Sequence, residues 1–456
     1  MASRSGNPHL ALWIAASGLS HGEIARRIAA AAKARGHNQI APDATRVRRW
    51  IDGERPRPPV PALLAEVLSE AACQPLTPGD LGLTATGPEL DGIQLPLLTE
   101  AAAQALVGWT QMDLLMNRRD TLTLALGAPL VLAAERMLGA AAHALNRGAS
   151  GFDAETVTAL EEVTAFFTKA DASQGGGLYR SAIVAQLAEV ARRIQDGVPP
   201  SLKTRVFAAT ADLAALAGWV SHDCGRYPQA QRYWSYGTYA AGEAGQPDRG
   251  VEIVTRMSHQ MIYLGHPADA LGLLGVAAEK ATLPATKALV ASQTGRVHAA
   301  LGDERQADRH LGAADQLLAD GLGAGVPEWV SYFDAAEHAG ARAVSARDLA
   351  GVGSARRPAS THFEDALKLR KPGFDRVTVM DRVGLAAALF DEGDAERGAA
   401  AAHQALDGAA RVDSALVASR LNTLLDAARP YDTASVEDVR ARAKELAAAR
   451  PTTIAA

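Results

Sequence analysis

Apolar residues recur at helical spacing in successive windows of the chain. In residues 9–16, for example, Leu10, Trp13 and Ile14 share one face of a helix, and residues 61–72 carry a similar apolar stripe. Alanine-rich and leucine-rich windows with few runs of β-branched or aromatic residues favour helices over strands. The pattern therefore predicts an all-α protein.

Helix start and stop signals divide the N-terminal part into four or five short helices. Ser20 and Glu23 have the spacing of a capping box, which predicts a helix from there to about Ala34. Pro42 and Asp43 restart the helical pattern after a break, and Gly53 with the prolines that follow ends it.

The helix predicted between Pro42 and Gly53 has two chemically different faces. Val47, Trp50 and Ile51 share one face. The opposite face carries Thr45, Arg48, Arg49 and Asp52, with Arg46 on the flank. Trp50 could stack on a nucleic-acid base, but its position beside Val47 favours a role as a core anchor. An anchored helix that presents arginines outward is how a DNA recognition helix is built.

Charge is distributed unevenly along the 456 residues, whose net charge is −5. Residues 1–60 hold ten Lys and Arg against four Asp and Glu, a charge of +6, which leaves −11 for the rest. The N-terminal part therefore suits a polyanion. The only cysteines, Cys73 and Cys224, lack disulfide or metal-ligand spacing, and no export signal or membrane-spanning run is found, so we expect a cytoplasmic protein.

A repeat begins after residue 200. Gly225, Gly265 and Gly302 are each followed by four residues and an alanine, and Gly393 echoes this pattern with Ala399. Each of these segments lies between two helical stretches, and the spacing leaves room for one degenerate repeat between 326 and 369. Such periodicity predicts a helical solenoid.

We accordingly predict a DNA-binding domain, a linker, a helical connecting region, a repeat domain and a tail, at residues 1–83, 84–96, 97–200, 201–450 and 451–456. Within the connecting region, Gly175–Gly177 could hold an anion at a helix start. Without a phosphate-loop lysine or hydroxyl nearby, a tight structural turn is favoured.

The repeat resembles the tetratricopeptide repeat over residues 203–450, because it has glycine at the interhelix turn and alanine where the second helix packs. Gly218 and Gly295 match that family's small residue on the first helix. The large apolar position on the second helix is matched by Trp234, Leu274 and Leu311.

The first 83 residues resemble a Cro/repressor-type helix-turn-helix, with a capped second helix, the Thr45–Trp50 segment and a Gly-x-Arg-x-Pro close. The connection between its two helices, about 30–42, is longer than the family pattern. Together the two parts are similar to large regulators of high-GC bacteria and, more distantly, to peptide-pheromone-responsive regulators.

These resemblances imply contacts with double-stranded DNA. Thr45, Arg48 and Arg49 are the candidates for base contacts. The candidates for phosphate contacts are Ser20, His21, Arg26, Arg27, Arg46, Arg55 and Arg57. The alternative for the flanking arginines is an ordinary solvated basic surface.

By analogy with tetratricopeptide ligand positions, residues counted back from each turn glycine could bind a peptide, small-molecule or protein effector. They are Asp212, Trp219, Asp223, Glu252, Thr255, His259, Tyr263, Ser292 and Arg296. Ordinary surface or packing is an equal alternative for any one of them. An aromatic cluster between Trp219 and Tyr239 could form a ligand cage, but packing between helices is favoured.

The sequence contains no catalytic motif, so we predict neither an enzyme nor a cofactor or metal. One hypothesis is a homodimeric, DNA-binding transcriptional regulator with a repeat domain that senses an effector. The other is an interaction scaffold without DNA binding.

Overall fold

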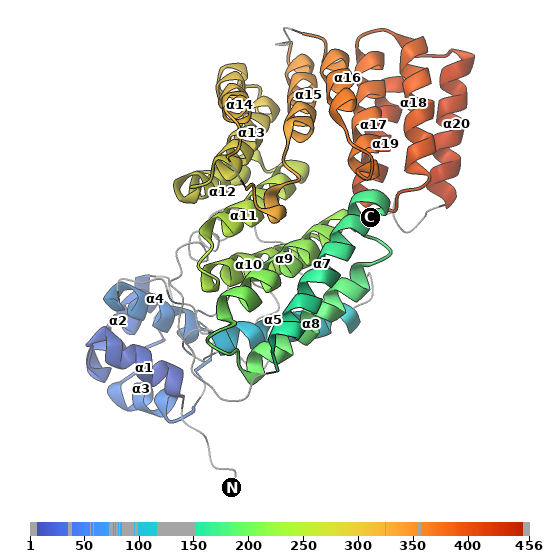
Figure 1. Ribbon diagram of the computed structural model, residues 1–456. Coiled ribbons are helices and arrows are strands. Elements are labelled where there is room, and N and C mark those ends of the chain that lie inside the picture. The colour runs from blue at the N-terminus through green and yellow to red at the C-terminus, as the bar shows by residue number, and fades with distance from the viewer. Residues whose placement is uncertain are drawn as a thin grey trace. The chain divides into compact units, whose positions relative to one another are not determined.

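The computed structural model describes residues 7–34, 39–54, 56–57, 59–72, 76, 78, 81, 83, 95, 99–115, 151–323, 325–353 and 357–449. Every regular element in these ranges is a helix (Figure 1), which confirms the all-α prediction. The chain divides into two compact units, Met1–Met112 and Asp113–Ala456. Among the described helices, none is long and apolar enough to cross a membrane.

The first unit is built on short helices that share one core. They are α1 (Pro8–Ser17), α2 (His21–Ala34), α3 (Ala44–Ile51) and α4 (Val60–Ala72), followed by α5 (Thr99–Leu115), which ends in the second unit. Gly18 ends α1 with a φ of 65°, a conformation that glycine adopts without strain. Leu10, Ile24, Val47 and Leu64 are fully buried in the core. The periodicity of the sequence therefore located both the helices and their inner faces.

The second unit is a longer helical array. Its helices are α7 (Ala154–Gln174), α8 (Arg180–Asp196), α9 (Lys203–Asp223), α10 (Tyr227–Glu243), α11 (Pro247–Tyr263), α12 (Pro267–Lys280), α13 (Pro284–Ala300), α14 (Glu304–Ala319), the 3-10 helix η1 (Glu328–Val330), α15 (Ala335–Gly351), α16 (Ala359–Leu369), α17 (Asp375–Asp391), α18 (Ala395–Ala409), α19 (Ala415–Ala428) and α20 (Ala434–Ala449).

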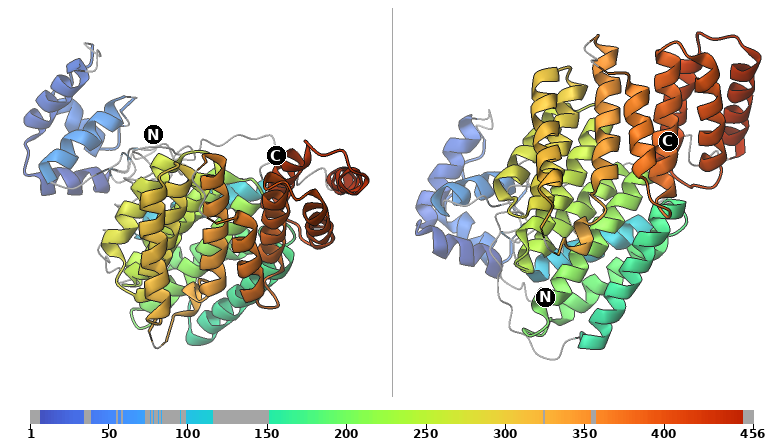
Figure 2. Two further views of the ribbon diagram at one scale, coloured as in Figure 1. Left: turned by 90° about the horizontal axis from the view of Figure 1, so that it is seen from above. Right: turned by 45° about the horizontal axis from the view of Figure 1, so that its top comes forward.

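From α9 onward, successive helices pack in consecutive pairs, as a solenoid-like fold requires (Figure 2). Gly225, Gly265, Gly302 and Gly393 form the turns inside four of these pairs, with φ between 73° and 90°. The degenerate repeat expected between 326 and 369 is the pair α15–α16, which η1 precedes. The glycine spacing therefore predicted the repeat turns correctly.

Small residues allow the two helices of a pair to approach closely. A Cβ atom on Gly295 of α13 would lie 2.6 Å from Cγ of Leu311 on α14. A Cβ atom on Gly218 of α9 would overlap the indole of Trp234 on α10. These are the pairs of positions on which the likeness to tetratricopeptide repeats rests.

The glycines that follow α7 form a tight structural turn. A Cβ atom on Gly176 would lie 2.7 Å from Cβ of Val220, so α9 leaves no room for a side chain there. The Gly176 N–H donates to Oδ2 of Asp223 at 3.3 Å, and the Gly177 N–H donates to the carbonyl of Asp413 at 3.4 Å. The anion at this helix start is thus a carboxylate of the protein itself.

Of the helices in the expected connecting region, α7 and α8 belong to the same compact unit as the repeats, whereas α5 lies in the first unit up to Met112. Both α7 and α8 pack on α9, and α7 also packs on α17. Apart from Leu95, the segments predicted as linker (84–96) and the tail (451–456) lie outside the described residues.

Candidate nucleic-acid and effector sites

The arginine-rich helix α3 is fixed at both ends and along one face. The Asp43 carboxylate caps its start by accepting the Arg46 backbone N–H at 2.7 Å. Gly53, with a φ of 95°, turns the chain away after its end. Val47 is fully buried and Trp50 is 3% exposed, both in the core of the first unit. Trp50 is therefore a core anchor, as its position on the helix indicated.

The outer face of α3 is solvent-exposed over Thr45, Arg46, Arg48 and Arg49. Arg46 pairs with Glu54, with 3.6 Å between Nη2 and Oε1. Arg48 and Arg49 form no ion pair with any residue in the described part of the chain. An outside partner can therefore bind their guanidinium groups without first breaking an internal pair.

The candidate phosphate contacts on α2 are more constrained. Arg27 donates from Nε to Oε1 of Glu23 at 2.9 Å, and Arg26 pairs with the same carboxylate. The hydrogen bond from Arg27 is the largest cause of a lowered Glu23 pKa. A phosphate that binds these arginines would therefore compete with the Glu23 carboxylate for their guanidinium groups.

The predicted capping box is formed in one direction. The Glu23 backbone N–H donates to Oγ of Ser20 at 3.2 Å. The Glu23 carboxylate binds arginines and makes no described bond back to Ser20. Ser20 and Arg57 are exposed and His21 is half-buried. Arg55 lies outside the described residues.

In the second unit, six of the predicted effector residues belong to one network of contacts. Trp219 and Asp223 come from α9, while Glu252, His259 and Tyr263 come from α11 and Arg296 from α13. The ring centroids of Trp219 and His259 are 5.8 Å apart. Nη1 of Arg296 lies 3.2 Å from Nδ1 of His259. We call these six residues, with His222, Arg256, Arg376 and Arg420 described below, the inner cluster.

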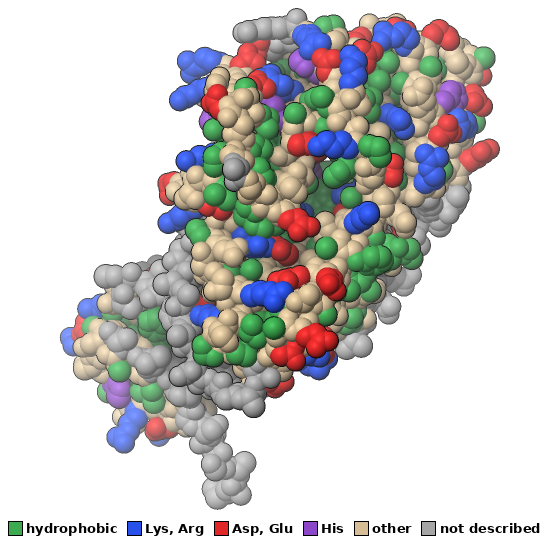
Figure 3. All heavy atoms as spheres, viewed as in Figure 1, with side chains coloured by type: hydrophobic (Ala, Val, Ile, Leu, Met, Phe, Trp, Pro, Cys, Tyr) green, Lys and Arg blue, Asp and Glu red, His purple; other side chains and the backbone are tan. Residues whose placement is uncertain are grey.

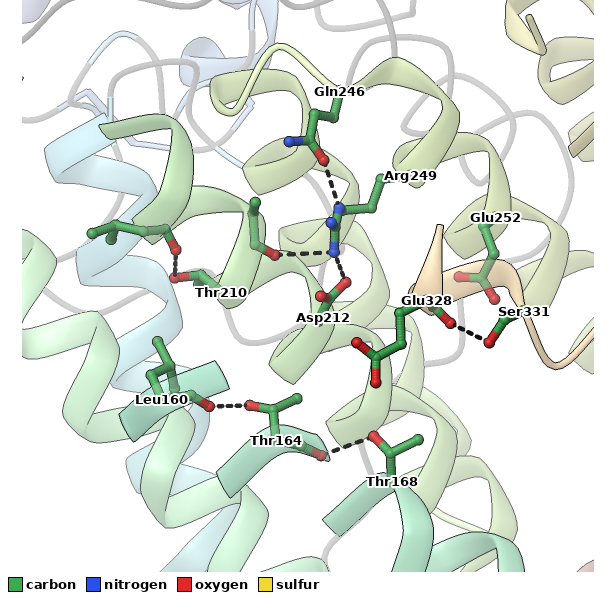
Figure 4. Close-up of polar contacts among 12 residues, drawn as sticks. Leu160, Thr164, Thr168, Thr210, Asp212, Gln246, Arg249, Glu252, Glu328 and Ser331 are labelled. Carbon is green, nitrogen blue, oxygen red and sulfur yellow. Dashed lines mark hydrogen bonds and ion pairs between the residues drawn. The ribbon is translucent and has the colours of Figure 1, made fainter. Parts of the chain in front are cut away.

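The three other predicted effector residues are engaged elsewhere. Asp212 pairs with Arg249, which also donates from Nε to Gln246 at 2.9 Å (Figure 4). Thr255 is 4% exposed and donates to the Val251 carbonyl of its own helix at 2.8 Å. Ser292 is 2% exposed, with its Oγ 2.8 Å from Nδ1 of His338. Because both hydroxyl groups are buried and hydrogen-bonded within the protein, Thr255 and Ser292 are poor candidates for ligand contacts.

His222, which the sequence reasoning missed, lies at the centre of the inner cluster. Its ring centroid is 5.4 Å from that of Tyr263, 5.7 Å from Trp219 and 5.9 Å from His259. The side chain is fully buried, and neither ring nitrogen has a hydrogen-bond partner among the described residues. Burial lowers the His222 pKa to about 3, so the ring is neutral at physiological pH.

Two arginines stack on Trp219. The guanidinium carbon of Arg376 lies 5.0 Å from the indole centroid, and that of Arg256 lies 5.7 Å away. Arg376 also donates from Nη2 to Oδ2 of Asp171 at 3.0 Å. Arg256 pairs with Glu252, which accepts the Tyr332 hydroxyl at 2.7 Å. Side chains from α7, α9, α11 and α17 are thereby joined through Trp219 and Arg376.

Burial and neighbouring charge determine the electrostatics of the cluster. Burial raises the Asp171 pKa to about 6 despite the opposing charge of Arg376. Burial, with Arg420 nearby, lowers the pKa of Arg296, and burial with Arg296 lowers that of His259. Acidic and basic side chains are interspersed over the face in Figure 3, which is hollowed near its middle.

The aromatic cluster singled out in the sequence divides into two groups. Tyr233, Trp234, Tyr236 and Tyr239 are almost completely buried and form packing between helices, as favoured. Trp219 and Tyr227 are half-buried. Trp219 belongs to the inner cluster, and the Tyr227 ring lies against two of its members, His222 and Tyr263.

Comparison with known proteins covers only the first unit. A family model described as the SP15 N-terminal domain matches residues 10–84, which include nearly all of α1 and the whole of α2, α3 and α4. No curated protein and no solved structure matches the chain with significance. The chain is thus similar to that domain family over a small N-terminal part of its length.

Proposed function

We propose that this protein is a sequence-specific DNA-binding transcriptional regulator. The observation that carries the proposal is the exposed, unpaired state of Arg48 and Arg49 on a helix whose opposite face Val47 and Trp50 fix in the core. An arginine at such a position can donate two hydrogen bonds to guanine in the major groove. The charge of +6 over residues 1–60 supports attraction to phosphate.

The repeat unit would supply the sensing and dimerisation functions. The inner cluster combines charged and aromatic side chains, the chemistry with which a protein recognises a polar ligand. A homodimer is proposed because one small module buries little surface on DNA, whereas two matched half-sites raise affinity and specificity together. The proposed location is the cytoplasm.

The experiment that tests DNA binding is genome-wide binding followed by gel shift at stated salt. We expect the full chain to select a defined sequence and the chain without residues 1–83 to lose it. The Arg48→Ala/Arg49→Ala double variant should lose most of the affinity for DNA. The control variant Lys33→Ala, which removes an exposed positive charge on α2, should lose little. Absence of specific binding at every salt concentration would refute the proposal.

The second candidate function is a protein-interaction scaffold without DNA binding. The observation that favours it is the solenoid-like array of paired helices, an architecture that presents extended binding surfaces. This function would be selected if the full chain captured a protein partner reproducibly and bound no DNA sequence.

A further inference from the structure

We propose that the inner cluster binds a small anion, through a carboxylate or phosphate group, between Arg296, Arg376 and Arg420. This inference rests on the proposed effector role of the repeat unit and gives the effector a chemical class. Three helices supply the arginines, α13, α17 and α19. Each is the first helix of its pair, so anion binding at this site would depend on how several repeats are arranged.

Unpaired hydrogen-bond donors are the first observation. Nε of Arg296 and Nε of Arg376 are buried without a hydrogen-bond partner. Nη1 of Arg376 also makes no hydrogen bond, although it lies 3.8 Å from Oδ2 of Asp223. Arg420 forms no hydrogen bond or ion pair within the described ranges. A buried charged donor without an acceptor is costly, because it has lost water and gained nothing in return. Oxygen atoms of an anion between these groups would supply the missing acceptors.

The distribution of carboxylates is the second observation. Arg256 is paired with Glu252, and Nη2 of Arg376 is paired with Asp171. Arg296 and Arg420 have no such pair among the residues that the structure describes. The positive charge of Arg420, after burial, lowers the pKa of Arg296. Asp348 attracts both from a distance without forming an ion pair. A bound anion would therefore relieve repulsion that the protein alone leaves in place.

The histidines add donors without adding charge. Arg296 donates to Nδ1 of His259 at 3.2 Å, which leaves the proton of the neutral ring on Nε2. Burial lowers the pKa of both His259 and His222, so neither ring adds a positive charge at physiological pH. The His222 ring lies 5.9 Å from the His259 ring, centroid to centroid, and neither of its nitrogens has a hydrogen-bond partner among the described residues.

The surrounding groups restrict the ligand to a small one. Asp171 and Asp223 border Arg376, so a polyanion such as nucleic acid would meet carboxylates as well as arginines. Both stacking arginines occupy Trp219, which leaves its ring unavailable as a platform for a large planar ligand. A compact carboxylate or phosphate compound meets these restrictions.

The test is isothermal titration calorimetry on the full chain at constant ionic strength. Inorganic phosphate and succinate are the two probes, and choline chloride is the cationic control. We expect at least one anion to bind at millimolar concentration or below, with no heat from choline. Binding of phosphate alone would assign a phosphate group to the ligand, and binding of succinate alone would assign a carboxylate. The proposal is overturned if neither anion binds.

Variants connect the binding to the arginines. Arg420→Gln and, separately, Arg296→Gln should weaken anion binding about tenfold or more, since each removes a charge-assisted hydrogen bond. Arg420→Lys should retain part of the affinity. Arg429→Gln removes an exposed arginine next to the end of the same helix and should leave binding unchanged. Wild-type affinity in both glutamine variants would contradict the assignment. Because the two substitutions are made in separate proteins, the test remains valid if one of the variants misfolds.

Operator binding measured on the same samples separates the two proposals. If the wild-type protein binds DNA but neither anion, the anion site is rejected and the regulator proposal is kept. Anion binding by a protein that binds no DNA would reject the regulator and keep the site.

Discussion

Gly218 on α9 packs so closely against Trp234 on α10 that a side chain on the glycine would overlap the indole ring. Trp234 is fully buried, and its Nε1–H donates to the Ala215 carbonyl at 3.1 Å, so the ring has a fixed position. The contact sets the separation of the two helices in the first repeat.

Replacement of this glycine should destabilise the repeat unit. We expect Gly218→Ala to lower the free energy of unfolding by about 1–3 kcal/mol, because an extra methyl group must displace a fixed ring. The measurement is urea unfolding followed by circular dichroism. Gly275→Ala is the matched control, since a Cβ there meets nothing within 4 Å and alanine favours a helix. Equal stabilisation by both substitutions would contradict the packing described here.

Loss of the Trp50 side chain should disrupt the first unit. We expect Trp50→Ala to lower the stability of that unit by about 3–5 kcal/mol, because it empties a buried position at the back of α3. Limited proteolysis of residues 1–83 would detect the change, and Trp50→Phe should be less susceptible. If Trp50→Ala kept a folded first unit and lost only DNA affinity, the indole would have to contact a base.

The proposed base and phosphate contacts should respond differently to substitution. On a selected DNA site, Arg48→Ala should cost about 1–3 kcal/mol and relax the sequence preference at one position. Arg57→Ala should weaken binding to all sequences and reduce the slope of log affinity against log salt by about 1. Gel shifts over a salt series, with single-base variants of the site, measure both effects. Identical profiles for the two variants would count against the assigned roles.

The neutral state of His222 should make stability depend on pH. Its pKa falls from 6.5 in the unfolded chain to about 3 in the folded protein, so the unfolded state binds the proton first. The free energy of unfolding should therefore fall as pH decreases from 6.5 towards 3. His222→Phe should reduce this dependence, as measured by thermal unfolding across that range. An unchanged pH dependence in the variant would show that the imidazole is exposed to protonation.

Asp171 has the opposite effect in part of that range. Its pKa is raised from 3.8 to about 6, so the folded state retains the proton longer than the unfolded chain does. That difference lowers stability as pH rises from 3.8 to 6. A comparison of His222→Phe with wild type isolates the histidine because Asp171 is common to both.

The helices and their inner faces were predictable because local spacing determines them. The positions of Val47 and Trp50 at 3.6 residues per turn were enough to orient α3. The turn glycines needed only their positive φ, which few other residues adopt without strain. Gly218 and Trp234 could be paired because a fixed offset from the turn places them in contact.

The inner cluster was only partly predictable, because its contacts span distant parts of the chain. Counting back from turn glycines found Trp219 and His259 but skipped His222, three residues before Gly225. Arg376 reaches Asp171, which is 205 residues away in sequence. Arg420 lies on α19, which is not followed by a turn glycine of the repeat pattern, so no position on that helix could be counted back from one. No local periodicity carries such information.

The polar links between α7, α9, α17 and α19 have a consequence for how the array can change. Arg376 binds Asp171, and the Ser414 hydroxyl, which caps α19, donates to Asp223 of the first repeat. An ordinary repeat array contacts only its neighbours, so it can gain or lose units at one end. Here deletion of the last hairpins would remove a hydrogen-bond partner from each of two buried carboxylates of the early helices, Asp171 and Asp223. Loss of these repeats should therefore destabilise the early helices as well, so we expect α7 to α19 to unfold together rather than one pair at a time.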